Sequence, residues 1–263
     1  MDNRDSVVWI TGASSGIGEA LAYVYSLKGA RLILSSRNFS RLKEVRSRCT
    51  RPEEHLVLPL DLADTASIGT GCKEALNHAG RIDTMIHSGG VSQRSLVAGT
   101  PLEVDRRIME TNFFGTVALT KAVLPSMLYR KSGRIAVISS LVGKFGTPLR
   151  SSYSASKHAL HGFFDSLRAE VWDQGIAITM VCPGFIRTRI SINALTADGT
   201  PQGTMDEAQA CGMLPDICAG KILKAIDDKK PEVYIGGREI LGVYLKRFAP
   251  SLFNRVIRKA KVT

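Results

Sequence analysis

Short apolar runs alternate with longer amphipathic segments along the whole chain, and this alternation constrains the fold most strongly. Seven runs have the length and composition of strands: 7–10, 31–35, 56–60, 82–87, 134–139, 176–182 and 233–235. Helix-length segments lie between them: 16–28, 41–49, 66–78, 102–130, 153–174 and 216–227. Nearly all-apolar strands joined through helices predict a parallel sheet covered on both faces. We therefore expect one α/β domain over 1–263, a Rossmann-type, doubly wound, seven-stranded parallel sheet flanked by helices.

Length and composition are consistent with one large buried core. The chain has 263 residues, of which 44% are hydrophobic. It contains no run of 18 apolar residues, so we expect no transmembrane helix. The first apolar run, 7–10, is too short for a signal-peptide core, and we expect a cytoplasmic protein. The cysteines are scattered without a C-x-x-C motif, which predicts reduced thiols and no metal site: Cys49, Cys72, Cys182, Cys211 and Cys218.

Positive charge is concentrated in two stretches. The formal net charge is +11, and residues 31–51 hold seven basic residues and one acid. Residues 246–261 hold six basic residues and no acid. Because the rest of the chain is close to neutral, this distribution argues against a nucleic-acid partner.

A glycine-rich turn, TGASSGIG, follows the first predicted strand. Gly12, Gly16 and Gly18 permit a sharp turn into a helix whose free N–H groups and dipole would face a pyrophosphate. The hydroxyls of Ser14 and Ser15 can add donors to the phosphate. Three glycines alone are weak evidence, but their place directly after the first strand strengthens the prediction of a dinucleotide site.

The end of the second predicted strand indicates which dinucleotide is bound. An acidic residue there would bind the adenine ribose hydroxyls and favour NAD. This chain has Ser36 followed by Arg37, so no carboxylate would repel a 2′-phosphate and a guanidinium could pair with it. NADP(H) is the predicted cofactor. The alternative is that Arg37 simply belongs to the basic face of the next helix.

A tyrosine and a lysine four residues apart lie on one face of the helix predicted at 153–174. Tyr153 and Lys157 are thereby neighbours. A nearby ammonium would lower the pKa of the phenol from about 10 toward the range useful for acid–base catalysis. Most such pairs are solvated surface residues, so the pair needs companions.

Companions occur at two further places. Ser139 and Ser140 end a buried strand, where a hydroxyl can hydrogen-bond a substrate carbonyl as negative charge develops on it. Asn112 lies inside the predicted helix 102–130, where it would favour a local kink that holds a water. The alternative interpretations are a strand-end cap for the serines and a simple helix flaw for Asn112.

In combination these motifs resemble those of the short-chain dehydrogenase/reductase family, over nearly the whole chain. The matching residues are Thr11, Gly12, Gly16, Gly18, Asp61, Asn112, Ser140, Tyr153, Lys157, Pro183, Gly184 and Thr188. Within the family, GVSQRS, SSYSASKHALHGFFDSLRAE and ISINALTADG resemble the branch that contains dehydrogenase/reductase member 7 proteins and 11β-hydroxysteroid dehydrogenase type 1.

The resemblance implies a role for each matched residue of the site. Tyr153 would donate the proton in reduction and accept it in oxidation. Lys157 would lower the pKa of Tyr153 and bind the nicotinamide ribose, and Ser140 would orient the carbonyl. Asn112 would hold a water of the proton relay. Thr188 would contact the cofactor carboxamide.

Two sets of lining residues follow from the same resemblance and from the apolar residues around the predicted site. The cofactor set is Gly12, Ser14, Ser15, Gly16, Ile17, Gly18, Arg37, Asn38, Asp61, Leu62, Ser88, Gly89, Gly90, Asn112, Tyr153, Lys157, Pro183, Gly184, Ile186 and Thr188. The substrate set is Ser140, Leu141, Val142, Phe145, Leu149 and Phe185, which predicts a lipophilic substrate.

The chain departs from the family pattern after the fourth predicted strand. Family members usually carry Asn-Asn-Ala-Gly there, whereas this chain has His87, Ser88, Gly89 and Gly90. Hydrogen bonding between the central strands is therefore in question. His158 and His161, near Lys157, are interpreted as packing or surface residues because neither lies beside Tyr153 in the way Lys157 does.

Two regions each allow alternative interpretations. Residues 185–215 follow a strand's carboxyl end and include the irregular stretch 193–212, which fits a substrate lid; the alternative is an ordinary solvent loop. Residues 237–263 form a basic helical tail with apolar positions spaced for one helical face: Leu245, Phe248, Leu252, Phe253, Val256 and Ile257. This tail would pack on its own domain or a sister subunit, or rest on an anionic membrane surface.

These observations predict an NADP-dependent oxidoreductase that interconverts a ketone or aldehyde and an alcohol. Its partner would be a small lipophilic substrate of the steroid, lipid or xenobiotic type, and the family resemblance implies a homodimer or homotetramer. The alternative is a non-catalytic NADP-binding sensor or scaffold, against which the complete set of Ser140, Tyr153, Lys157 and Asn112 argues.

Overall fold

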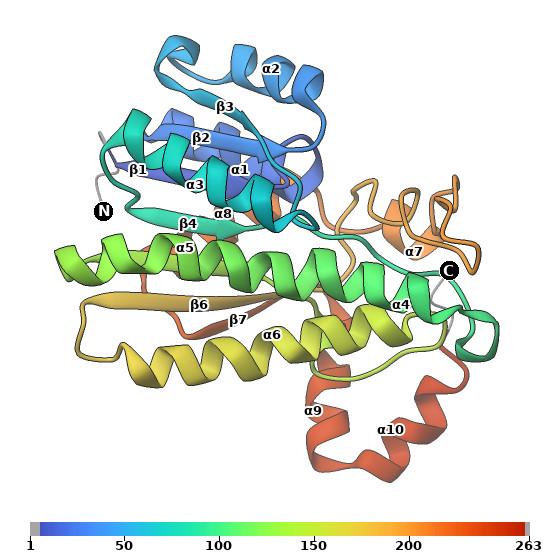
Figure 1. Cartoon of the computed structure of the whole chain (residues 1–263). Helices are drawn as coiled ribbons and strands as arrows, with labels where there is room; N and C mark the ends of the chain where they lie inside the picture. Colours follow the sequence, from blue (N-terminus) through green and yellow to red (C-terminus); the bar gives the residue numbers. More distant parts are fainter. Residues whose placement is uncertain (1–5, 261–263) are drawn as a thin grey trace.

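The structure, a computed structural model, describes residues 6–260. Its centre is one sheet of seven parallel strands in the order β3-β2-β1-β4-β5-β6-β7, with helices on both faces (Figure 1). The strands are β1 Val7–Thr11, β2 Arg31–Ser36, β3 Leu56–Pro59, β4 Thr84–His87, β5 Gly133–Ile138, β6 Ile176–Pro183 and β7 Glu232–Ile235. The predicted doubly wound sheet is confirmed.

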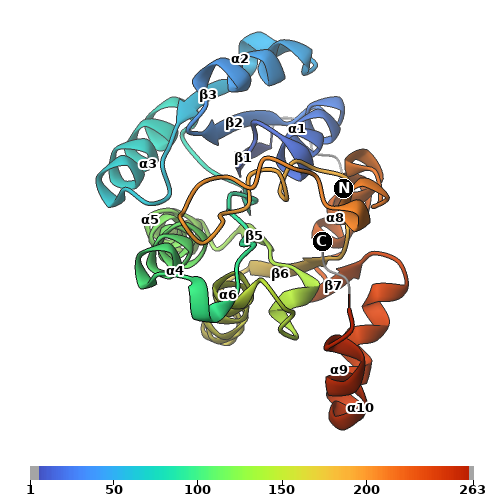
Figure 2. The ribbon, with the colours of Figure 1, turned by 90° about the vertical axis from the view of Figure 1, so that its right-hand side faces the viewer.

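The helices cover the sheet in two layers (Figure 2). One face carries α1 (Gly16–Leu27), α2 (Phe39–Arg48) and α8 (Pro215–Asp227). The other carries α3 (Thr65–Ala79), α5 (Gly115–Arg130) and α6 (Ser151–Glu170). The remaining α-helices are α4 (Leu102–Met109), α7 (Glu207–Ala210), α9 (Leu241–Phe248) and α10 (Pro250–Ile257).

Alternation along β1 explains why both faces are covered. Val8 and Ile10 pack into the core beneath α1 and α8, whereas Val7 and Trp9 pack into the core beneath α3, α5 and α6. Successive strand side chains point to opposite faces, so an all-apolar strand needs a helical layer on each side. The chain reverses its direction of winding between β1 and β4, and a crevice forms at their carboxyl ends.

The helix predicted over 102–130 is interrupted. It consists of α4, a π-helical turn at Glu110–Phe114 and α5. The kink predicted around Asn112 is therefore present, as a widened turn.

The C-terminal tail differs from the single helical face that was predicted. Ala249 leaves helical geometry (φ −139°, ψ 64°) and Pro250 begins a new helix, so α9 and α10 fold against each other. As a result Phe253 is buried while Phe248 is 79% exposed. No helix in the described part of the chain is long and apolar enough to cross a membrane.

Candidate active site

A cleft of about 2180 Å³ lies at the carboxyl ends of the strands. It runs from the glycine turn, past the ends of β4 and β5, to the α9–α10 pair. Of the predicted cofactor residues, all except Gly18 and Asn112 line it. Of the predicted substrate residues, Leu149 alone does not line it. The structure therefore brings most of both predicted sets to one cleft.

The turn after β1 leaves the start of α1 open to this cleft. Gly12 and Gly16 have φ values of +66° and +59°, in the left-handed region that favours glycine. A Cβ on Gly12 would come within 2.7 Å of the Ser88 carbonyl oxygen. No side chain caps the N-terminus of α1, so its N–H groups are available to an anion such as a pyrophosphate. The residues fit a dinucleotide here.

Gly18 does not line the cleft and lies inside α1. A Cβ there would overlap the carbonyl oxygen of Gly12. The absence of a side chain therefore allows the helix to pack against the turn that leads into it.

Basic residues surround the end of the cleft next to β2. Arg37 is exposed and lines the cleft, and Asn38 caps α2 by accepting a hydrogen bond from the Arg41 amide at 3.0 Å. Arg41 also lines the cleft, between the carboxylates of Glu19 and Glu44. The sequence analysis did not identify Arg41, although it belongs to the basic stretch 31–51.

The departure from the family pattern is accommodated by hydrogen bonds between strands. The Thr11 hydroxyl accepts from the amides of Ser88 and Gly89, each at 3.2 Å, and so joins the end of β1 to the end of β4. His87 is buried, and its Nε2 lies 2.9 Å from the Thr120 hydroxyl. Burial lowers the pKa of His87 to about 3, so the ring is neutral.

Asn112 lies behind the cleft wall rather than in it. Its Oδ1 accepts from the Val91 amide at 2.8 Å, and its Nδ2 donates to the Val91 carbonyl at 2.9 Å and to Ser156 at 3.0 Å. Ser156 in turn donates to the Tyr153 carbonyl at 2.8 Å. Asn112 thus fixes the chain after β4 relative to the helix that carries Tyr153 and Lys157.

Tyr153, Lys157 and Ser140 meet in the middle of the cleft. Lys157 Nζ donates to the Ile138 carbonyl at 2.9 Å and lies 5.6 Å from the centroid of the Tyr153 ring. Ser140 accepts from the Val142 amide and donates to the Pro183 carbonyl, both at 3.3 Å. Burial lowers the pKa of Lys157 to about 8.

The pKa of Tyr153 differs from the prediction. Burial raises it, and the groups that oppose this rise are Arg150, the Ser140 hydroxyl and Arg94. The lowering expected from Lys157 is thus supplied by other groups, and the net direction is upward. The phenol is therefore protonated at neutral pH.

Arg94 and Arg150 converge on the carboxylate of Asp206 beside Tyr153. Arg94 Nε donates to Asp206 Oδ2 at 3.0 Å, and Arg150 Nη2 lies 3.4 Å from the same oxygen. All three side chains are buried. Burial lowers the pKa of Arg150 to about 10. The sequence analysis missed this cluster because its members lie in loops without periodicity.

Apolar residues form the end of the cleft beyond Ser140. Leu141, Val142, Phe145 and Phe185 lie there, as predicted. Leu149 does not, because its left-handed backbone (φ +64°) turns the chain and its carbonyl accepts from the Ser95 amide. The missing part of the wall comes from the C-terminal helices and was not predicted: Leu241, Leu245, Phe253, Val256 and Ile257.

Comparison with known proteins decides the family. The model of the short chain dehydrogenase family matches residues 6–198. The chain belongs to the short-chain dehydrogenase/reductase family. The predicted resemblance is thereby confirmed, and the chain is an oxidoreductase of a family that uses a nicotinamide cofactor.

Relatives of this dehydrogenase/reductase include SDR family protein 7-like of Anopheles gambiae, 46% identical over 96% of this chain and 82% of that protein. The Drosophila melanogaster protein of the same name is 45% identical over 97% of this chain and 80% of that protein. Dehydrogenase/reductase SDR family member 7B of Xenopus laevis is 43% identical over 96% and 80%. The branch named from the sequence is therefore supported.

Solved structures confirm the fold of this family member. A short-chain dehydrogenase from Streptomyces avermitilis, 28% identical, superimposes with a TM-score of 0.81 over 97% of this chain and 98% of that chain. A short-chain dehydrogenase/reductase from Burkholderia phymatum in complex with NAD, 20% identical, gives 0.85 over 96% of each chain. The second likeness bears on the fold alone.

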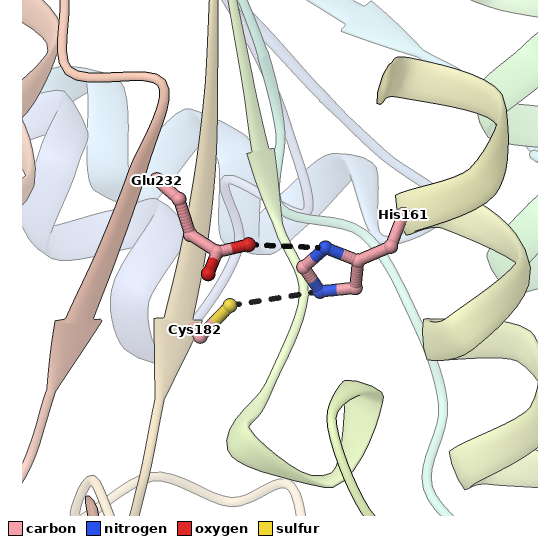
Figure 3. A group of neighbouring side chains, drawn as sticks. All are labelled: His161, Cys182 and Glu232. Atoms are coloured by element: carbon pink, nitrogen blue, oxygen red, sulfur yellow. Dashed lines mark hydrogen bonds and ion pairs between the residues drawn. The ribbon is translucent and has the colours of Figure 1, made fainter. Parts of the chain in front are cut away.

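A buried polar cluster lies behind the active site of this dehydrogenase/reductase (Figure 3). His161 Nδ1 lies 3.4 Å from Glu232, and its Nε2 lies 3.6 Å from Cys182 and 3.1 Å from Ser139. The carboxylate and the thiol therefore contact opposite ring nitrogens, an arrangement of hydrogen-bonded packing rather than of ligands around one ion. Burial lowers the pKa of His161 to about 4, whereas His158 is exposed.

Proposed function

We propose that this enzyme interconverts a lipophilic ketone or aldehyde and the corresponding alcohol with NADP(H). The observation that carries the proposal is the position of Tyr153. It lines the same cleft as the glycine turn, and its ring packs against the small apolar core that contains Leu141 and Phe145. A group placed there can transfer a proton to a substrate held against a nicotinamide ring.

The roles of the polar groups follow from their positions. The cofactor, when bound, supplies or accepts the hydride. Tyr153 donates its hydroxyl proton to the carbonyl oxygen in reduction, and Ser140 donates a hydrogen bond to the same oxygen. The raised pKa of Tyr153 keeps this proton available at neutral pH. Arg150 and Arg94 then stabilise the phenolate that forms.

Lys157 and Asn112 support this chemistry in different ways. Lys157 lines the cleft and, while protonated, would hold the cofactor ribose hydroxyls. Asn112 fixes Val91 and, through Ser156, the turn of α6 that carries Tyr153. We retain for Asn112 the further role of holding a water in the proton relay.

Selectivity for NADP(H) is supported by charge at the end of β2. Arg37 and Arg41 line this end of the cleft, where Ser36 stands in place of the acid that would bind ribose hydroxyls. The carboxylate of Glu19 also lines the cleft, but Arg41 and the Tyr23 hydroxyl engage it. A 2′-phosphate would therefore meet cations.

The substrate would be apolar apart from its carbonyl. The cleft wall beyond Ser140 is formed by aliphatic and aromatic side chains of η4 (Leu141–Gly143), Phe145, Phe185 and the C-terminal helices. Residues 185–215 contribute side chains to the cleft wall and, through Asp206, are fixed to Arg94 and Arg150, which supports their role as a substrate lid.

Substitution of Tyr153 by Phe tests the enzyme against the alternative, a non-catalytic NADP sensor or scaffold. The variant should lose NADPH oxidation with a panel of ketones by about 10²-fold or more. Its affinity for NADPH, measured by fluorescence, should be retained. A wild-type protein that binds NADPH but reduces no carbonyl of the panel would favour the sensor.

We further propose that the enzyme is a homodimer or homotetramer. Two exposed aromatic side chains, Phe114 of the π-helical turn and Tyr129 of α5, support an unfilled interface there. Sedimentation velocity tests this, and a monomer at micromolar concentration would contradict it.

A further inference from the structure

The two C-terminal helices form a projection beside the substrate end of the cleft. We call α9 and α10, residues 241–257, the C-terminal hairpin. Figures 1 and 2 show it extending away from the layered body, beyond the edge of the sheet at β7. One of its sides contacts the active-site region, and the other faces outward.

The inner side of the hairpin is fixed to the catalytic domain. Phe253 is only 4% exposed, and its ring centroid lies 5.3 Å from that of Phe145. Leu245 and Ile257 pack into the same small core, which also contains Leu141. The hairpin is therefore a rigid part of the cleft wall.

The hairpin exposes several large apolar side chains. Phe248 is 79% exposed, and Leu252 is exposed on the next helix. Leu241, Tyr244 and Val256 are exposed as well, although the Tyr244 ring also packs against Tyr234. Monomeric proteins rarely expose so many large apolar side chains together. The hairpin is suited to contact with another apolar phase or surface.

Five cations accompany these apolar residues: Lys246, Arg247, Arg255, Arg258 and Lys259. All five are exposed, and the hairpin sequence contains no acid. Among residues 6–260 none of them forms an ion pair. The other basic stretch differs, because on α2 the cation Arg41 is paired with Glu19 and Glu44.

The outer side is continuous with the interior of the cleft. Leu241 and Val256 each line the cleft and are also more than half exposed. An apolar molecule that leaves a surface in contact with the hairpin would therefore meet these two side chains at the cleft, whose wall also includes Phe253 and Phe145.

We propose that the C-terminal hairpin docks on the surface of an anionic lipid bilayer and opens the substrate end of the cleft toward the lipid. Exposed apolar residues enter the headgroup boundary, and the interspersed cations pair with anionic headgroups. Delivery of a lipophilic substrate from the bilayer rests on the proposed function, whereas the docking itself does not.

A second copy of the chain fits this surface less well. A two-fold interface brings the same patch of each subunit together, so the cations in and just after each hairpin would face those of the other. Like charges at close range oppose such a contact. A surface with many negative charges complements the hairpin along its whole length.

Vesicle co-sedimentation tests the docking without any need for activity. Wild-type protein should bind phosphatidylcholine vesicles that contain about 30% phosphatidylserine at least ~10-fold more strongly than pure phosphatidylcholine vesicles. Phe248→Glu and Leu252→Glu should each reduce this binding several-fold. Trp172→Glu is the matched control, because Trp172 is 80% exposed on a different part of the molecule and should leave binding unchanged.

Two double variants with the same change in net charge distinguish binding by the hairpin from binding by the overall positive charge of the protein. Lys246→Glu with Arg247→Glu should weaken binding to the anionic vesicles, whereas Lys43→Glu with Arg46→Glu on α2 makes the same change in net charge and should have little effect. Circular dichroism and thermal unfolding would verify that all variants are folded. Equal loss in both pairs would overturn the proposal.

Tryptophan quenching by brominated lipid reports which face meets the bilayer. Phe248→Trp in a Trp172→Phe background should be quenched, while the native Trp172 should not. Absence of wild-type binding would overturn the proposal, as would a dimer that Phe248→Glu converts to monomer while vesicle binding is unchanged. Loss of carbonyl reduction in Tyr153→Phe with intact vesicle binding would separate catalysis from docking.

Discussion

Arg94 Nε donates to Asp206 Oδ2 at 3.0 Å and thereby joins two loops that are 112 positions apart in the sequence. Arg94 follows β4, and Asp206 lies in the region over the cleft. Arg150, just before α6, contacts the same oxygen. The carboxylate therefore connects the segment 185–215, the loop after β4 and the start of the helix that carries Tyr153.

Asp206→Asn should lower the free energy of unfolding by about 3 kcal/mol, because it leaves buried guanidinium groups without their counter-charge. Urea unfolding measures this. Asp165→Asn is the control, since Asp165 forms an exposed pair with Arg168 and should cost about 0.5 kcal/mol or less. Equal effects of the two substitutions would contradict the role of Asp206.

The stability contribution of Asp206 should also depend on pH. Burial raises the pKa of this carboxyl. Hydrogen bonds and charges from Arg94, Gln202 and Arg150 lower the pKa by more than burial raises it, so the net direction is downward. The contribution is present above the ordinary carboxyl pKa of about 3.9 and is lost as pH falls through the lower folded value. The difference between wild type and Asp206→Asn should therefore shrink in acid.

Lys157 should give a pH trend of the same sign on the alkaline side. Its pKa falls from 10.5 to about 8 on folding because the ammonium is buried. Between these values the unfolded chain holds the proton and the folded chain does not, so stability rises with pH. Relative to Lys157→Met, the wild type should gain stability from pH 8 toward pH 10.5, as measured by denaturant unfolding. A flat difference would show that Lys157 stays charged.

Two glycine-to-alanine substitutions should have opposite effects on the free energy of unfolding, because a Cβ at one position meets other atoms and at the other position meets none. Gly18→Ala should lower the free energy of unfolding by about 1–3 kcal/mol, since its Cβ overlaps the Gly12 carbonyl, and should weaken nucleotide binding. Gly162→Ala, in α6 with no atom within 4 Å of its Cβ, should instead raise it by about 0.5–1 kcal/mol. Thermal unfolding with and without NADPH distinguishes the two.

Arg37→Ala should change the preference between NADPH and NADH. The substitution removes a charge-assisted hydrogen bond worth about 1.5 kcal/mol or more. It should therefore weaken the binding of NADPH at least ~10-fold and leave the affinity for NADH nearly unchanged. Lys43→Ala removes the same charge from α2 without a place in the cleft and should change neither affinity. An unaltered preference in Arg37→Ala would refute the assignment of the 2′-phosphate site.

Local patterns were sufficient for the parts of the fold and site that depend on neighbours in sequence. Runs such as 7–10 and 31–35 became β1 and β2 because an apolar strand has nowhere to lie except between two layers. The pair Tyr153 and Lys157 lies on α6 as the four-residue spacing requires. The break at Pro250 also carried a local signal, which the apolar spacing of the tail obscured.

By itself, then, the sequence determined the doubly wound sheet, the glycine turn and the middle of the cleft, since periodicity, turn chemistry and the succession of strands and helices along the chain are local properties. The tertiary structure alone decided the partners of Asp206, the raised pKa of Tyr153, the exclusion of Leu149 from the cleft and the wall supplied by the C-terminal hairpin. These depend on which distant loops meet and on how deeply each charge is buried. Desolvation and long-range pairing arise only when the chain has closed on itself.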